Sequence, residues 1–145
     1  MITIKELLKN INIDSIPIAH QHNLSDLLAK INVIRKAYGK PMTVTSGYRS
    51  MQDQLRINPK APNSKHLSGQ ACDIADSNGE LREWVLLNLQ LCKDVGLWLE
   101  DPRYTKGWIH FSTVPPKSNK RIFIPYSGLP PHPELWDGDY DKTLD

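Results

Sequence analysis

The stretch SKHLSGQACDIAD, residues 64–76, carries a histidine and an aspartate seven positions apart, with mostly small residues between them. The second half of the stretch has the alternation of a β-strand, and Asp73 occupies one of its inward positions. A charged side chain at such a position is costly unless it is paired or bound to a metal. Two interpretations are open: a loop that runs into an ordinary strand, or a metal site with His66 and Asp73 as two of its ligands. In the second case, the other ligands must lie far away in the sequence.

Another histidine lies inside an apolar segment. His110 belongs to GWIHFST, residues 107–113, and an imidazole in an apolar strand also needs a partner. Two imidazoles and one carboxylate match the three protein ligands of a catalytic zinc site, which keeps one position for water. The spacing of His66 and Asp73 is a weak signal by itself, and it becomes specific only together with the flanking residues.

The composition is that of one soluble globular domain. The chain has 145 residues, 39% of them hydrophobic, and a mean hydropathy of −0.46, which suit a single domain spanning 1–145. The net charge is +2, no Lys/Arg block indicates nucleic-acid binding, and no apolar run approaches the roughly 18 residues of a membrane span. The N-terminus is too polar for a secretory signal, so we expect synthesis in the cytoplasm, no membrane insertion and a monomer.

Cysteine usage narrows the kind of metal site. The two cysteines, Cys72 and Cys92, form no C-x-x-C pair, so neither a zinc ribbon nor a redox motif is present. Any metal should therefore be held by histidines and carboxylates. A further pair, His20 and His22, is close enough in sequence to hold a metal by proximity.

Periodicity and capping signals predict four helices. A capping box of Thr3 and Glu6 opens the first helix, and Ser50 caps the third. An S-x-x-E pattern, Ser77 to Glu80, opens the fourth. The predicted helices span 4–10, 23–38, 51–58 and 77–96.

Alternating or β-branched segments predict five short strands, at 42–48, 70–76, 97–100, 108–113 and 121–125. Connections of hairpin length dominate the second half of the chain. We therefore predict the α+β class, with a small, mostly antiparallel sheet packed against helices. The tail, 125–145, is rich in Pro, Gly and Asp and is expected to be irregular.

Three segments, in this order, resemble the zinc D-alanyl-D-alanine peptidase family: TSGYRS (45–50), SKHLSGQACDIAD (64–76) and GWIHFS (107–112). That family includes bacterial DD-carboxypeptidases and phage endolysins, and its fold is shared with the hedgehog signalling domain. The resemblance extends over roughly residues 24–124, and three ordered motifs are a specific signal. It implies the hedgehog/DD-peptidase fold for this chain.

The resemblance also implies roles for individual residues. His66, Asp73 and His110 would bind Zn²⁺. Arg49 would face the substrate, where its guanidinium hydrogen-bonds a peptide carbonyl or a terminal carboxylate and stabilises the oxyanion. Ser64 is expected to act as a hydrogen-bonding residue beside the ligand loop, on the substrate side, with a plain loop cap as the alternative.

The general base is where this chain departs from the family pattern. Many relatives carry a carboxylate three residues before the last histidine, where this chain has Gly107; others carry a histidine two residues before it, where this chain has Trp108. We predict Glu100 as the base, because it ends a strand expected to pair with the strand of His110. Burial would raise its pKa into a useful range. Asp101 is the alternative base, and a simple loop-edge charge is the alternative role of Glu100.

The resemblance implies a zinc metallopeptidase that hydrolyses peptidoglycan stem peptides at bonds to D-amino acids. The expected setting is a phage endolysin, made in the host cytoplasm and acting at the bacterial cell wall or periplasm. DD-carboxypeptidase and LD/DD-endopeptidase activity both stay open. The absence of a carboxylate at Gly107 favours an alternative without catalysis, a zinc-containing wall-binding or virion structural module on the same fold.

Overall fold

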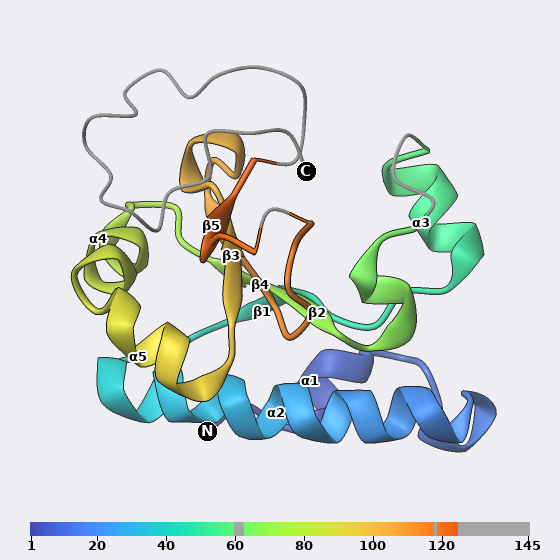
Figure 1. Cartoon of the computed structure of the whole chain (residues 1–145). Coiled ribbons are helices and arrows are strands. Elements are labelled where there is room, and N and C mark those ends of the chain that lie inside the picture. Colours follow the sequence, from blue (N-terminus) through green and yellow to red (C-terminus); the bar gives the residue numbers. More distant parts are fainter. Residues whose placement is uncertain (60–62, 118, 125–145) are drawn as a thin grey trace.

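The computed structural model describes residues 1–59, 63–117 and 119–124, in which short and long helices surround a small sheet (Figure 1). The irregular tail expected at 125–145 lies outside the described residues. The α-helices are α1 (Ile4–Leu8), α2 (Ile18–Tyr38), α3 (Met51–Ile57), α4 (Glu80–Leu87) and α5 (Leu89–Val95). Short 3-10 helices are η1 (Ile13–Ser15), η2 (Lys65–Ser68) and η3 (Pro102–Tyr104). The strands are β1 (Val44–Ser46), β2 (Ala71–Ala75), β3 (Trp98–Glu100), β4 (Trp108–Ser112) and β5 (Ile122–Phe123).

The strands form a five-stranded sheet in the order β1-β2-β4-β3-β5. Strand β2 runs antiparallel to β1 and β4, and β3 runs antiparallel to β4 and parallel to β5. The expected α+β class, with a mostly antiparallel sheet against helices, is confirmed. Each predicted strand is present and shorter than its predicted range, because pairing ends before the alternating pattern does.

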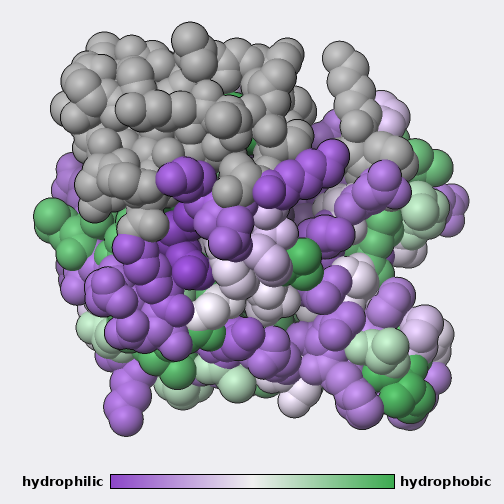
Figure 2. Space-filling model, viewed as in Figure 1, coloured by the Kyte–Doolittle hydropathy of each residue, from purple (hydrophilic) through white to green (hydrophobic). Residues whose placement is uncertain are grey.

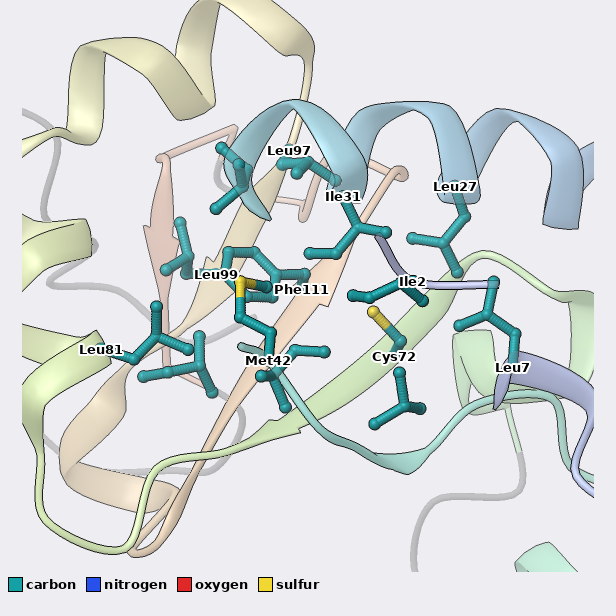
Figure 3. Packing of buried hydrophobic residues seen from close by; sticks show 14 of the residues in the cluster. Ile2, Leu7, Leu27, Ile31, Met42, Cys72, Leu81, Leu97, Leu99 and Phe111 are labelled. Atoms are coloured by element: carbon teal, nitrogen blue, oxygen red, sulfur yellow. The ribbon is translucent and has the colours of Figure 1, made fainter. Parts of the chain in front are cut away.

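One face of the sheet carries the hydrophobic core. Cys72 and Ile74 of β2, and Ile109 and Phe111 of β4, are each at most 1% exposed. Helix α2 runs along this side of the sheet with α1 beside it (Figure 1), and Figure 3 shows Phe111 among the core side chains near Ile31 of α2. Because side chains alternate along a strand, the residues between these core positions point to the opposite face.

Helix α2 is longer than its periodicity predicted. It begins at Ile18, where Pro17 O accepts the first helical hydrogen bond from Gln21 N at 3.1 Å. Ile18 is 63% exposed, so the first turn carries no apolar stripe that would mark it in the sequence. The predicted end is confirmed: Gly39 closes the helix in the left-handed conformation, with φ of 76°. Across the described ranges, α2 and the other helices all lack the combination of length and apolarity needed to cross a membrane.

The single helix expected at 77–96 is wrong, because the chain forms two helices that meet at Asn88. Asn88 N bonds to the carbonyls of Trp84 and Val85, and its side-chain amide donates to Trp84 O at 2.8 Å, which closes the first helix there. The expected Ser77–Glu80 capping box is wrong as well.

The start of α4 is held by an aspartate that lies further upstream. Gly79 is the N-cap and adopts φ of 75°. This left-handed turn bends the chain back, so that the Asp76 carboxylate accepts hydrogen bonds from Leu81 N at 2.8 Å and Arg82 N at 2.9 Å. A carboxylate at this end of a helix satisfies free N–H groups and interacts favourably with the helix dipole.

We predict that Asp76→Ala lowers the free energy of unfolding by about 1–2 kcal/mol, because two helical N–H groups lose their acceptor. Ser77→Ala is the matched control and should change it by less than about 0.5 kcal/mol. Urea denaturation followed by circular dichroism measures both variants. A larger loss for Ser77→Ala than for Asp76→Ala would contradict this account of the helix start.

Candidate metal centre

Five residues, one from each strand, form a cross-strand row over the sheet. Asp73 of β2 pairs in register with Ser46 of β1 and with His110 of β4. The register of β3 and β4, continued by one residue, sets Glu100 opposite His110. Glu100 in turn pairs with Phe123 of β5. The neighbours of these residues along β2, β4 and β3 are buried in the core, so the row lies on the face away from the core.

A second histidine reaches the row from outside the sheet. His66 belongs to η2, which Gly69 ends in the left-handed conformation with φ of 76° just before β2 begins. His66 Nε2 lies 3.4 Å from Asp73 Oδ2, and His110 Nδ1 lies 2.8 Å from Asp73 Oδ1. The two imidazole rings are 5.2 Å apart between centroids. The three residues predicted as metal ligands are thus brought together.

The geometry of the three side chains suits a zinc ion. One ligand atom from each of them lies within 4.8 Å of the other two. Ligand atoms around tetrahedral zinc are about 3.3 Å apart. Here His110 Nδ1 is 2.8 Å from Asp73 Oδ1, and His66 Nε2 is 3.4 Å from the other oxygen, Oδ2. The side chains of His66, Asp73 and His110 are only 3%, 10% and 15% exposed, so the donors are held rather than free in solvent. Two imidazole nitrogens and a carboxylate are the donor set that catalytic zinc sites use.

Burial and charge act on the three groups in different ways. Burial lowers the pKa of His66 and outweighs the opposite effect of Asp73. Burial would raise the pKa of Asp73, but hydrogen bonds from His110 and His66 outweigh it and hold the carboxylate ionised. Burial would lower the pKa of His110, but the hydrogen bond and charge of Asp73 raise it above its ordinary value. Of the three predicted ligands, His110 is therefore the one at which a proton would compete most strongly with a cation.

We predict that zinc affinity falls with decreasing pH. A histidine ligand must be neutral, and the pKa of His110 is raised above the ordinary 6.5 in the metal-free protein. Below that pKa, binding must displace one proton, so the apparent affinity should fall about tenfold per pH unit. Competition with a chromophoric chelator between about pH 8 and pH 5.5 measures this. An affinity that is constant across the interval would contradict the prediction.

The backbone of the SGYRS segment orients His66. His66 Nδ1 donates to Gly47 O at 2.7 Å, which leaves Nε2 as the nitrogen that faces Asp73. Gly47 itself lies against α1: a Cβ there would be 2.2 Å from Leu7 O. The next residue fixes this contact, because Tyr48 N donates to the same carbonyl at 2.8 Å. Position 47 therefore has no room for a side chain, which explains the glycine. The SGYRS motif by itself does not indicate this role.

We predict that Gly47→Ala weakens zinc binding about 10- to 100-fold, because the added methyl pushes the Gly47 carbonyl away from His66. Chelator competition measures the affinity, and circular dichroism verifies the fold. Gly79→Ala is the control: it strains a left-handed glycine at the start of α4 and should lower stability without changing zinc affinity. Equal zinc affinity of Gly47→Ala and the wild type would refute the orienting role.

Arg49 lies against the proposed ligands. Its Nη2 donates to Asp73 Oδ2 at 3.3 Å, its Nε to Ser46 Oγ at 2.8 Å, and its Nη1 to Gln54 Oε1 at 2.9 Å. The side chain is 14% exposed. Burial lowers the pKa of Arg49, but its reference value is so high that the group stays charged. Gln54 was not recognised in the sequence, where a glutamine in a short helix has no distinguishing signal.

The two candidate bases have different surroundings. Glu100 is half-buried in the cross-strand row, and burial raises the pKa of its carboxyl, while His110 lowers it and Asp73 raises it further. Asp101 is fully buried and caps η3, with its carboxylate 2.7 Å from Arg103 Nη2. Its carboxylate is thus engaged in a structural ion pair.

The remaining predicted polar residues have structural contacts. Ser64 is the N-cap of η2, and its hydroxyl accepts a hydrogen bond from His66 N at 3.3 Å. His20 Nδ1 lies 2.9 Å from the Tyr48 hydroxyl. Neither His20 nor His22 joins the cluster of possible metal ligands found among the described residues.

Comparison with known proteins identifies the family. The family model described as Peptidase M15 matches residues 1–111, which include the first two motifs, all of GWIHFS except Ser112, and both histidines of the site. The chain therefore belongs to the peptidase M15 family, whose members are zinc-dependent peptidases. Among solved structures, the chain is similar to the L-Ala D-Glu endopeptidase ChiX of Serratia marcescens, at 20% identity and a TM-score of 0.45, over 72% of this chain and 96% of that one. None of the curated proteins compared with the chain matches it.

Proposed function

We propose that this chain is a peptidoglycan peptidase in which His66, Asp73 and His110 hold Zn²⁺ and Glu100 is the general base. The observation that carries the proposal is the cross-strand row, in which a carboxylate of raised pKa stands beside a converged His/Asp/His set. We further propose that residues 1–145 act as one catalytic domain. The hydrogen bond from His66 Nδ1 to Gly47 O supports Nε2 as the ligand atom of His66.

When bound, Zn²⁺ polarises a peptide carbonyl and makes water more acidic. Glu100 takes the proton from the attacking water and later returns it to the leaving amine, so that atoms and charge balance over the cycle. A carboxyl whose pKa is raised by burial lies closer to the operating pH and transfers protons in both directions more readily. The surroundings of Asp101 argue against it as the base, because its carboxylate already pairs with Arg103.

Arg49 is proposed to donate to the oxygen of the scissile carbonyl as negative charge develops there. Its Nη2 is already 3.3 Å from Asp73 Oδ2, which supports a location beside the reacting centre. For Ser64, the hydrogen bond that its hydroxyl accepts from His66 N supports a role in shaping the ligand loop. Direct contact of Ser64 with the substrate stays a prediction.

The substrate class follows from the family. We propose stem peptides of peptidoglycan, cut at a bond to a D-amino acid, and a phage endolysin as the biological setting. Carboxypeptidase and endopeptidase activity are separated by product analysis on defined muropeptides, because the first releases a terminal residue and the second cuts an internal bond. The alternative, a wall-binding or virion module without catalysis, rests on the missing carboxylate at Gly107. The register that sets Glu100 opposite His110 supports catalysis over this alternative.

We predict that Glu100→Gln lowers kcat on muropeptides by about 10²- to 10⁴-fold while zinc affinity stays within about threefold of the wild type. The amide has the same shape but cannot accept the proton, and Glu100 is outside the ligand set. Chromatography of muropeptide products and chelator competition are the two measurements. His66→Ala should lose zinc and activity together, and with them the clearing of permeabilised Gram-negative cells.

Asp101→Asn is the matched control for Glu100→Gln. It should lower stability, because Arg103 loses a buried partner, but leave the chemical step largely intact. Full activity of Glu100→Gln, or no hydrolysis by the zinc-loaded wild type, would remove the proposed mechanism. Zinc binding without hydrolysis would favour the module without catalysis.

A further inference from the structure

Helix α3 has an inverted distribution of polar and apolar side chains. Met51, Leu55 and Ile57 are 52%, 47% and 56% exposed, whereas Gln54 is 1% exposed. In Figure 1, α3 lies apart from α2, and Figure 2 shows hydrophobic residues on the surface over α3. Surface helices normally bury their apolar stripe and expose their amides. A buried glutamine on such a helix therefore calls for a specific reason.

The reason is found in the contacts of the buried amide. Gln54 Oε1 accepts a hydrogen bond from Arg49 Nη1 at 2.9 Å, and Gln54 Nε2 donates to Asn58 O at 3.5 Å. Burying an amide costs free energy unless both of its ends are hydrogen-bonded. The helix itself is anchored next to Arg49, because Ser50 is its N-cap and accepts from Asp53 N at 3.1 Å.

The planar guanidinium of Arg49 is thereby held on two edges. Ser46 Oγ accepts from Nε, and Gln54 Oε1 accepts from Nη1. With these two donors fixed, the plane of the group is fixed, and Nη2 is directed at Asp73 Oδ2. Without the bond to Gln54, the side chain keeps its bonds to Ser46 and Asp73 but loses the acceptor at Nη1, so the orientation of the guanidinium plane is less strongly fixed.

We infer that Gln54 is a positioning residue that aims Arg49 at the reacting centre. The inference rests on the proposed function for its catalytic consequence, because Arg49 is the group that would meet the developing oxyanion. The hydrogen bonds of Gln54 described above connect it to Arg49 and to Asn58 O. Its loss should therefore affect the chemical step and leave metal binding unchanged.

The experiment compares three variants in the zinc-loaded full chain. Gln54→Met keeps the volume and removes the acceptor, and it should lower kcat about 10- to 100-fold with KM and zinc affinity within about threefold. Gln54→Glu keeps an oxygen acceptor for Arg49 and should restore kcat to within about fivefold of the wild type. Leu55→Ala, next to Gln54 but exposed, is the control for general damage to α3 and should leave kcat unchanged. Should Gln54→Met not fold, Gln54→Asn replaces it, because its amide is one methylene shorter.

A second readout does not depend on activity. In the wild type, the arginine side-chain ¹⁵N spectrum should contain slowly exchanging Nη signals from Arg49, assigned by their absence in Arg49→Lys. These signals should average in Gln54→Met and persist in Leu55→Ala. Slow signals that persist in Gln54→Met, or an unchanged kcat in that variant, would overturn the inference. If the wild type binds zinc but hydrolyses no muropeptide, the proposed function fails, and the spectra still decide whether Gln54 fixes Arg49.

Discussion

The site depends on one carboxylate, Asp73, that has three positively charged or protonatable partners. His110, Arg49 and His66 approach its two oxygens at 2.8, 3.3 and 3.4 Å. A carboxylate that is 10% exposed on a strand between two core residues would be strongly destabilising by itself. Its partners come from the loop after β1, from η2 and from β4, so satisfying this charge requires these distant segments to meet in one arrangement.

The core and the site lie on opposite faces of the same strands. Cys72 and Ile74 pack toward α2, and Asp73 between them points the other way; Ile109 and Phe111 bracket His110 in the same manner. Rigid packing on the core side therefore fixes the backbone from which the predicted ligands Asp73 and His110 project. The N-terminal helix contributes to the same end, because the carbonyl of Leu7 in α1 is in close contact with the loop whose Gly47 holds His66.

Whether an element could be predicted depended on how local its sequence signal is. The strands were predictable because alternation is a local pattern, and the capping box of Thr3 and Glu6 was confirmed for the same reason. The helix at 77–96 was wrong because its start depends on a left-handed Gly79 that lets Asp76 reach back, and its middle on Asn88 closing a turn. Both are local backbone conformations, and neither leaves a periodic pattern of apolar residues in the sequence.

The sequence alone was enough to predict the α+β class, the family, and the ligand candidates His66, Asp73 and His110. These predictions rest on motif order and residue type, which are properties of the chain itself. Only the tertiary structure decided which carboxylate stands beside His110, since the register of β3 against β4 is set by packing across the sheet. It also decided why position 47 is glycine and why position 54 is a buried amide. Those requirements arise from contacts between segments, and such contacts exist only once the chain has folded.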